Sequence, residues 1–556
     1  MTSAMPAPVI RNNAFMKEYI KFDQLSVLVI DDIMAMRHAL KAQLQSFGVS
    51  CINLSSNAED AIKRIEQMDY DLILCDYNLH KFSSGQHFLE YLRNKKLLKA
   101  TTIFVMVTAE TEYSYVANAV EFTPDDYILK PCSEDKLKKR LEKLIDRRAL
   151  LMPVLKAINE LQIETALKEC DKLLPMPGNK WVMDILKRKA ELLIELKDYD
   201  NATLTYQQAL TVRDEAPWAL LGLARTCFAL GDVQQAGELA RLIVKSNPNY
   251  VATYELLAEM EALAENDSGV FNTLLLTSKI LPSAKRYRDV SEAAFVIGKL
   301  DEAKSLQESA IRLAAGSMVE SCDDYLSLAQ IMVDLKNPEA AIKILEKDAK
   351  KYAESGLYGV IKNAILAQAY SDCDDQSKAR KLLERSTNLL GGRKSDCTAL
   401  TALGKANLKL GDMPSGLKLL TYAVQASNAG KDRRPILHVT KAMVDTGHSD
   451  KVNDVIDGGN KRILMLVEEA RKIVHSADFK AAYHKITEAL DIHHENIEAL
   501  FAAAQLHLLW IRHEGSHDKI LIARAKTYLS TLDKLLPQNE KVMGFYRFFR
   551  ETVGEK

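Results

Sequence analysis

The sequence has few cysteines and no long apolar segment. Its eight cysteines are scattered singly, without a CxxC pair, so we expect neither structural disulfides nor a thiolate zinc site. The first 22 residues lack the apolar segment that a secretory signal needs. No run of about 18 apolar residues occurs anywhere in the chain. We therefore expect a cytoplasmic protein without a membrane span.

The sequence also has almost no net charge. Lysine and arginine number 74 against 75 acidic residues, which leaves a net charge of −1. This balance gives no support to nonspecific attraction to nucleic acid or membranes. At 556 residues the chain is too long for one compact core, so it must contain several domains or a repeat architecture that grows by stacking.

Short aliphatic runs alternate with helical segments in residues 22–146, after an N-terminal tail at 1–21. This alternation predicts an α/β domain with a doubly wound, five-stranded parallel sheet. The expected strands are 26–30, 51–54, 71–75, 102–107 and 126–129, and the expected helices are 34–47, 58–67, 86–95, 114–120 and 134–144.

Charged and polar residues stand at the ends of these strands. Asp31 and Asp32 follow the first strand, Asp76 follows the third, Thr108 ends the fourth and Lys130 follows the fifth. Because the carboxyl ends of parallel strands meet at one edge of a sheet, these side chains should converge there. Three neighbouring carboxylates repel one another unless cations neutralise them. A Mg²⁺ ion together with the ammonium of Lys130 would do so.

Four motifs in residues 22–146 resemble those of a known family. VLVIDDIMAMR, LILCDYN, MVTAE and DYILKP resemble the receiver domain of two-component response regulators, and the segment is similar in length and order to the single-domain chemotaxis regulator. The resemblance implies a flavodoxin-like fold and phosphorylation by a histidine kinase or phosphotransfer protein. It also implies site roles: Asp76 as phosphoacceptor, Mg²⁺ ligands at Asp31, Asp32, Asp76 and the backbone carbonyl of Asn78, phosphoryl contacts from Thr108 and Lys130, and a switch formed by Thr108 and Tyr127.

The segment departs from the family pattern in two loops, one of which has Thr123-Pro124-Asp125 in place of a small-residue turn before the fifth strand. His80 stands where the family usually has proline, and Phe82, Ser83 and Ser84 replace a hydrophobic–acidic pair before Gly85. None of these changes removes a group that the chemistry needs. The alternative interpretation is a receiver fold that is no longer phosphorylated.

Helical periodicity replaces the strands over 147–556, and small residues recur where each second helix opens. Ala202 and Ala236 are 34 residues apart, as are Pro248 and Pro282. A period of 34 with this pattern resembles the tetratricopeptide repeat, and predicts an all-α solenoid of about eight to ten repeats, best formed over 180–282. The alternative is a non-repeating helical bundle. Looser copies centre on Ala166, Ala303, Ala341, Ala379, Gly416 and Ala482.

One helix of the solenoid carries a candidate binding surface. By resemblance to the repeat family, Trp218, Leu221, Arg225 and Phe228 would line a groove that holds an unknown protein ligand. Aromatic residues with arginine are typical of binding hot spots. The alternative is that the aromatic side chains simply pack between repeats.

These observations predict a phosphorylation-controlled adaptor that binds proteins and is not an enzyme. A regulator acting directly on nucleic acid is a second hypothesis, although no DNA-binding domain is visible. A receiver-controlled metalloenzyme is a third, because HEGSH at 513–517 matches the HExxH zinc motif. A glycine and a serine inside that motif weaken the helix that it requires.

Overall fold

The computed structural model falls into two compact units. The first comprises Met1–Met260, Asn272–Ser283 and Leu313–Glu320, and the second comprises Glu261–Phe271, Ala284–Arg312 and Ser321–Lys556. The structure describes residues 22–79, 83–108, 124–176, 178–317, 319–348, 352, 356–391, 396–426, 433–492, 496–514, 518–536 and 539–553.

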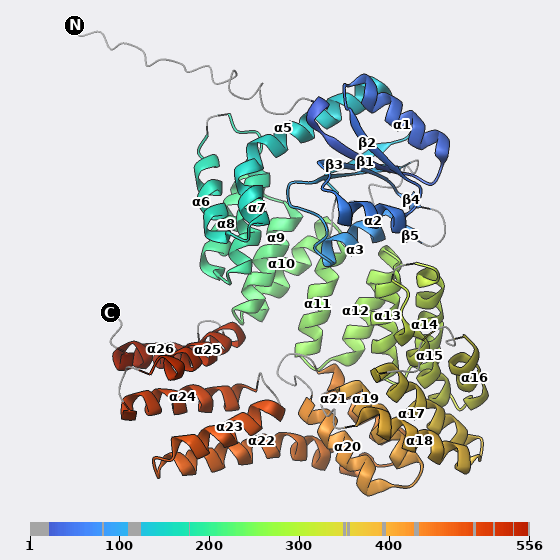
Figure 1. The fold of residues 1–556 in the computed structure, drawn as a ribbon, viewed down its shortest axis with the longest axis vertical. Helices are drawn as coiled ribbons and strands as arrows, with labels where there is room; N and C mark the ends of the chain where they lie inside the picture. Colours follow the sequence, from blue (N-terminus) through green and yellow to red (C-terminus); the bar gives the residue numbers. More distant parts are fainter. Residues whose placement is uncertain are drawn as a thin grey trace. The chain divides into compact units, whose positions relative to one another are not determined.

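The first unit opens with a five-stranded parallel sheet in the order β2-β1-β3-β6-β7 (Figure 1). This confirms the predicted fold class and all five strands. The structure adds a two-residue antiparallel pair, β4 and β5, in the loop after β3. The helix expected at 114–120 lies outside the described residues. The strands are β1 Ser26–Ile30, β2 Cys51–Ser55, β3 Leu72–Asp76, β4 Asn78–Leu79, β5 Ser83–Ser84, β6 Ile103–Thr108 and β7 Asp126–Leu129.

Both faces of this sheet are covered by helices, which explains why its strands are continuously apolar. In β1, Val27 and Val29 point into a core cluster with side chains of α1 and α5, whereas Leu28 and Ile30 point into a second cluster with side chains of α2 and α3. These helices are α1 Met34–Ser46, α2 Ala58–Gln67, α3 Gly85–Asn94 and α5 Glu134–Asn159.

Helix α5 belongs to both the sheet domain and the solenoid. Its leucines 137, 141 and 144 pack into the core of the sheet domain, and its residues 151, 154 and 155 pack into the core of the first helical repeat. The helix continues through Pro153. The domain boundary expected at 146/147 therefore lies inside one continuous helix, and no linker separates the two domains.

The remaining helices form antiparallel pairs, as the repeat pattern predicts. The small residues expected at the close approaches are buried: the alanines at 166, 202, 236, 303, 341, 379 and 482 are all 0% exposed. The helices are α6 Ile163–Leu173, α7 Val182–Glu195, α8 Tyr199–Val212, α9 Pro217–Ala229, α10 Val233–Ser246, α11 Val251–Leu263, α12 Asp267–Ile280, α13 Ala284–Val296, α14 Leu300–Ala314, α15 Cys322–Asp334, α16 Pro338–Lys343, α17 Gly356–Asp372, α18 Gln376–Leu390, α19 Cys397–Lys409, α20 Met413–Ala426, α21 Arg434–Asp445, α22 Val452–Val474, α23 Phe479–Ile492, α24 Ile497–Glu514, α25 Lys519–Leu535 and α26 Glu540–Val553.

The recurrent GD and KD dipeptides form the turns inside the repeats. Gly231 has a φ of 89° and Lys197 a φ of 58°, a left-handed conformation that ends the first helix of a repeat. The following aspartate caps the second helix: the carboxylate of Asp232 accepts a hydrogen bond from the backbone N–H of Gln235 at 2.9 Å. The sequence thus encodes these helical hairpins locally.

Candidate functional site

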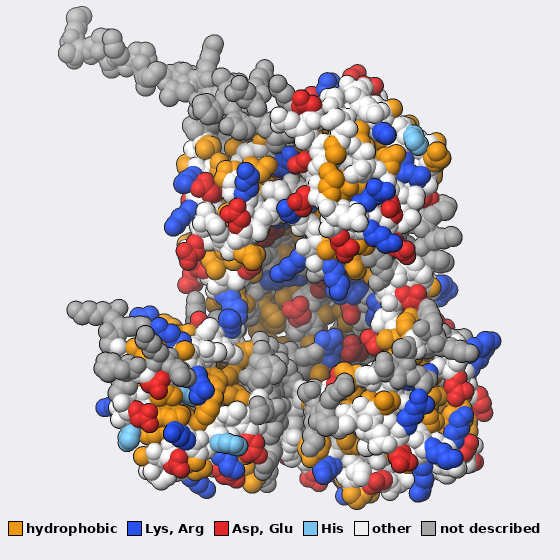
Figure 2. All heavy atoms as spheres, viewed as in Figure 1, with side chains coloured by type: hydrophobic (Ala, Val, Ile, Leu, Met, Phe, Trp, Pro, Cys, Tyr) orange, Lys and Arg blue, Asp and Glu red, His pale blue; other side chains and the backbone are white. Residues whose placement is uncertain are grey.

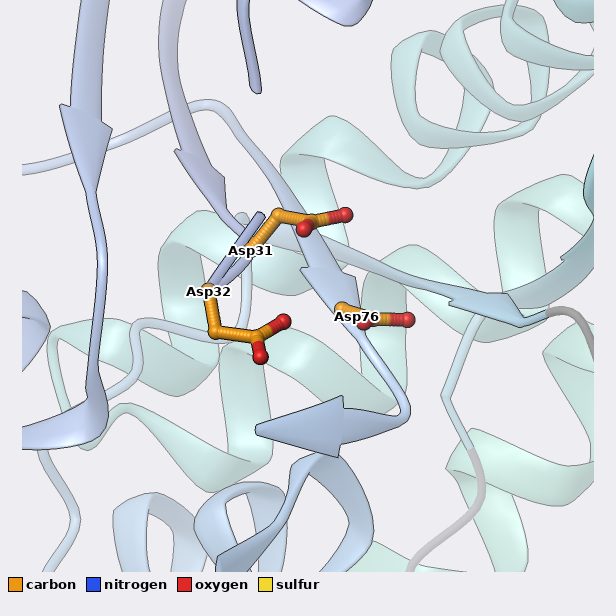
Figure 3. A group of neighbouring side chains, drawn as sticks. All are labelled: Asp31, Asp32 and Asp76. Carbon is orange, nitrogen blue, oxygen red and sulfur yellow. The ribbon is translucent and has the colours of Figure 1, made fainter. Parts of the chain in front are cut away.

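Three carboxylates meet at the carboxyl edge of the sheet, as the strand ends predict. Asp31 directly follows β1 and is fully buried, whereas Asp76 is the last residue of β3 and is 7% exposed. Carboxylate oxygens of Asp31, Asp32 and Asp76 lie within 4.8 Å of one another (Figure 3). Their strands are neighbours in the sheet, which is why residues 45 positions apart in sequence form one cluster.

Lys130, directly after β7, supplies an ammonium group to this cluster. Its Nζ lies 2.6 Å from Oδ2 of Asp31 and 2.9 Å from Oδ1 of Asp76. Burial raises the pKa of the Asp76 carboxyl, although Lys130 acts in the opposite direction. Burial disfavours the charge on Lys130, but hydrogen bonds to Asp31 and Asp76 and the electrostatic attraction of these two carboxylates together outweigh burial and raise the pKa of Lys130. The ammonium therefore stays charged.

The remaining charge of the cluster suits a divalent cation. Three carboxylates and one ammonium retain an excess of negative charge, and the ligand atoms that the three acids offer are oxygens, which Mg²⁺ prefers. The residues present therefore fit the magnesium site that the sequence predicts, and among the described residues this is the one group of three or more acidic, histidine or cysteine side chains placed to hold a metal.

Thr108 and Tyr127 lie on the two strands beyond Asp76. Thr108 ends β6 and is 1% exposed, and its carbonyl accepts a hydrogen bond from the backbone N–H of Lys130 at 2.7 Å. Tyr127 of β7 is buried in the core, its hydroxyl 3.5 Å from Oε1 of Gln86, and burial raises its pKa. The side chain of Tyr127 therefore lies in the core of the sheet domain.

The loop after Asp76 carries Asn78 and requires a glycine. Asn78 pairs with Ser84 across the β4–β5 ribbon, which brings the chain back beside β3. At Gly85 a Cβ atom would lie 2.3 Å from the carbonyl oxygen of Asp76 and 2.7 Å from the sulfur of Met106. Only glycine fits this close approach, so Gly85 fixes the backbone of Asp76 and keeps Asn78 at the same edge of the sheet.

Sequence reasoning missed two residues near the site. One guanidinium nitrogen of Arg37 donates to the backbone carbonyls of Asp31 and Asp32, at 2.5 and 2.9 Å, and so holds the loop that carries both acids. The position of Arg37 inside the DDIMAMR motif could have indicated this role. Gln86 is 2% exposed and lies beside Tyr127. A single glutamine after a glycine does not reveal in the sequence that it will be buried there.

The candidate groove residues of α9 are divided between packing and exposure. Leu221 is 6% exposed and packs against α10 and α11 in a core cluster, which corrects its expected place on a binding surface. Trp218 and Phe228 are half-buried, and the Trp218 ring meets the edge of Tyr206 at 6.2 Å. Arg225 is partly exposed. The packing alternative thus accounts for most of this set.

Other candidate features find less support in the structure. His513 and Glu514 end α24, and residues 515–517 of the HEGSH motif lie outside the described residues. On the face shown in Figure 2, basic and acidic side chains are interspersed, which does not favour a nucleic-acid surface. No helix that the structure describes is long and apolar enough to cross a membrane.

Comparison with protein families identifies both parts of the chain. A family model described as "Response regulator receiver domain" matches residues 27–142, and one described as "Tetratricopeptide repeat" matches residues 193–260. The chain joins a receiver domain to tetratricopeptide repeats. Receiver domains generally bind Mg²⁺ at an acidic pocket, which here corresponds to the cluster of Asp31, Asp32 and Asp76.

Individual relatives match the receiver domain. Chemotaxis protein CheY-3 of Vibrio cholerae is 26% identical over 130 residues, which cover 23% of this chain and 98% of that protein. Transcriptional regulatory protein ZraR of Escherichia coli is 29% identical over 126 residues, covering 22% of this chain and 27% of that protein. A solved tetratricopeptide repeat protein from Parabacteroides merdae covers 46% of this chain and 97% of its own, with 11% identity and a TM-score of 0.29.

Proposed function

We propose that this protein is a response regulator in which phosphorylation of Asp76 controls protein binding by the tetratricopeptide repeats. The observation that supports this most directly is the position of Asp76. Its carboxylate ends a buried strand, beside those of Asp31 and Asp32 and 2.9 Å from the ammonium of Lys130.

The proposed reaction takes a phosphoryl group from a phosphohistidine of a histidine kinase or phosphotransfer protein. A carboxylate oxygen of Asp76 attacks phosphorus, the bond from phosphorus to the donor imidazole breaks, and the imidazole keeps the electron pair. Lys130 neutralises charge on the transferred phosphoryl group, and the Thr108 hydroxyl donates a hydrogen bond to it.

Magnesium would be held in this pocket by Asp31, Asp32, Asp76 and the backbone carbonyl of Asn78. When bound, it supplies positive charge to the phosphoryl oxygens. The chain's own residues position the reacting carboxylate: Gly85 fixes its backbone, and Arg37 fixes the loop that carries Asp31 and Asp32.

The output that we propose is protein binding, and the function is signalling rather than enzymatic. Tetratricopeptide repeats are protein-binding solenoids, and the family model of these repeats matches residues 193–260, C-terminal to the receiver match at 27–142.

Labelling with a small phosphodonor tests the proposal. Full-length protein incubated with acetyl phosphate and Mg²⁺ should gain one phosphoryl group in intact-mass measurements, and removal of Mg²⁺ with a chelator should prevent the gain. The Asp76→Asn variant should not be labelled. Equal labelling of this variant and of the wild type would contradict the assignment of Asp76.

A further inference from the structure

Three arginines of α5 fasten this helix to the sheet of the receiver domain. Arg140 pairs with both carboxylate oxygens of Asp126, at 2.7 and 2.6 Å. Arg148 has a side chain that is 5% exposed, and it donates to the carboxylate and the backbone carbonyl of Asp71 at 3.0 and 3.1 Å. Bidentate and buried charged contacts of this kind hold a helix in one position.

The third arginine, Arg147, joins the receiver domain to the first full repeat. One of its guanidinium nitrogens pairs with Asp125, and another lies 3.2 Å from Oδ1 of Asp184 on α7. All three side chains are about one-third exposed or less. A single cation therefore connects a carboxylate of the receiver domain with a carboxylate of the solenoid.

Asp125 is tied to the same strands that form the phosphorylation pocket. Its second carboxylate oxygen accepts a hydrogen bond from the backbone N–H of Phe104 in β6 at 2.9 Å. Strand β6 ends at Thr108, and β7 connects Asp125 to Lys130 through four residues. A displacement of Thr108 or Lys130 along these short strands therefore reaches Asp125 directly.

We propose that Arg147 couples phosphorylation of Asp76 to the first repeat, and that the coupling acts in both directions. A shift of Asp125 changes how closely Arg147 approaches Asp184, and hence the position of α7. By linkage, a change at Asp184 alters the affinity of the receiver pocket for a phosphoryl group. This inference rests on the proposed function, because it requires a phosphoryl group at Asp76.

An equilibrium measurement tests the coupling in the full-length protein. Beryllofluoride with Mg²⁺ stands in for the phosphoryl group, and calorimetric titration gives its dissociation constant. Asp184→Asn removes one charge next to Arg147 and should change that constant by about two- to thirtyfold. The matched control is Asp171→Asn, because Asp171 pairs with Lys189 of α7 at 2.7 Å and no hydrogen bond or ion pair joins it to the described part of the receiver. Its dissociation constant should equal that of the wild type.

Hydrogen exchange provides a second test that does not depend on one variant. Beryllofluoride should change the protection of residues 182–195 in the wild type, and Arg147→Gln should abolish this change while thermal melting shows that the variant is folded. Equal constants for the Asp184 and Asp171 variants, or an unresponsive α7, would overturn the coupling alone. A wild type that binds no beryllofluoride would overturn the proposed function together with the coupling.

Discussion

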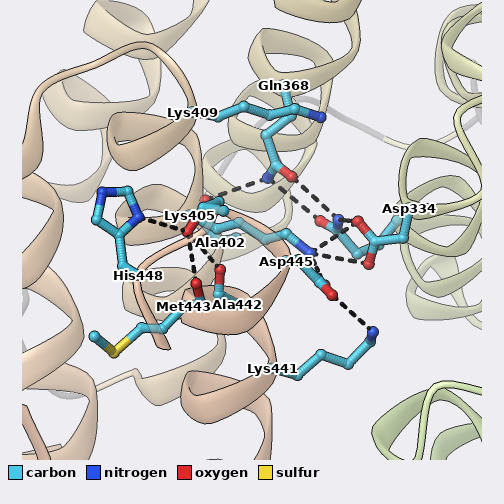
Figure 4. Close-up of polar contacts among 12 residues, drawn as sticks. Asp334, Gln368, Ala402, Lys405, Lys409, Lys441, Ala442, Met443, Asp445 and His448 are labelled. Carbon is cyan, nitrogen blue, oxygen red and sulfur yellow. Dashed lines mark hydrogen bonds and ion pairs between the residues drawn. The ribbon is translucent and has the colours of Figure 1, made fainter. Parts of the chain in front are cut away.

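Lys405 and Asp334 form a buried, two-point ion pair between α19 and α15 of the second unit (Figure 4). The ammonium of Lys405 lies 2.8 and 2.9 Å from the two carboxylate oxygens of Asp334, 71 residues away, and 2.7 Å from Oδ2 of Asp445 on α21. The side chains of Lys405 and Asp334 are 6% and 4% exposed. One lysine therefore ties together the first helices of three repeats.

Replacement of Lys405 by methionine should strongly destabilise the second unit. The variant leaves the buried carboxylate of Asp334 without the cation that pairs with it, whereas the partly exposed Asp445 keeps its ion pair with Lys441. Removal of one partner of a buried ion pair costs about 3–5 kcal/mol. Chemical denaturation measures this loss. The control Lys172→Met removes an ion pair whose lysine is 66% exposed and should cost at most about 1 kcal/mol. Equal losses of unfolding free energy in the two variants would mean that the buried ion pair stabilises the protein no more than an exposed one.

The loss in the Lys405→Met variant should depend on pH. Burial already raises the pKa of Asp334, and Lys405 lowers it; without Lys405 the pKa must rise further. When folding raises the pKa of a carboxyl, the group does not lower the stability of the protein at pH values below its ordinary pKa. The stability falls as the pH rises through the pKa of the folded state. The destabilisation should therefore be larger at about pH 7 than at about pH 4.5. Chemical denaturation at both pH values checks this direction. A larger loss of unfolding free energy at the lower pH would contradict it.

Local patterns made most of the fold predictable, whereas long-range contacts were hidden from sequence reasoning. The strand ends predicted that Asp31, Asp76 and Lys130 converge, because parallel strands share one edge. The 34-residue spacing predicted buried alanines, because helices of a repeat approach closely there. The pair of Lys405 and Asp334 had no such signal, since its partners lie on separate helices, 71 residues apart, and no shared strand edge brings them together.

The ion pairs at the receiver–repeat junction escaped prediction for a related reason. Arg147 and Arg148 stand in a charged stretch of the kind that usually forms a solvated helix face. Their roles depend on Asp184, Asp125 and Asp71, whose positions are set only by the tertiary fold. The helix expected at 134–144 continues as α5 to Asn159. Helical periodicity alone does not show that one helix packs into two hydrophobic cores.

Substitution of Gly85 by alanine should destabilise the receiver domain and impair labelling of Asp76. The new methyl group would collide with the carbonyl oxygen of Asp76 at 2.3 Å, and overpacking of this kind costs about 1–3 kcal/mol. Gly544→Ala is the matched control, because nothing lies within 4 Å of its added Cβ in α26. This control should be neutral or stabilise the protein by about 0.5–1 kcal/mol. Thermal melting of both variants, with acetyl phosphate labelling, would show whether the effect is confined to Gly85.

Two substitutions in α9 separate packing from exposure in the candidate groove. Leu221→Ala should cost about 2–5 kcal/mol, because Leu221 fills the core between repeats. Arg225→Ala should cost about 1 kcal/mol or less, since Arg225 is partly exposed. Denaturant titration measures both values. If Arg225→Ala proved as costly as Leu221→Ala, Arg225 would be a structural residue and a poor candidate for ligand contact.

Truncation within α5 should show that this helix belongs to two cores. A fragment of residues 134–556 would expose Leu137, Leu141 and Leu144, which pack into the receiver core in the intact chain, and we expect it to self-associate through this apolar stripe. A fragment of residues 150–556 lacks the stripe and should remain monomeric and helical, because each repeat mainly contacts its neighbours. Its first repeat should exchange hydrogen faster than in the full chain, since the contact of Arg147 with Asp184 and the packing of Ala100 against that repeat are lost. Light scattering and hydrogen exchange measure these two outcomes. Complete unfolding of the shorter fragment would show that the solenoid depends on the receiver for its stability.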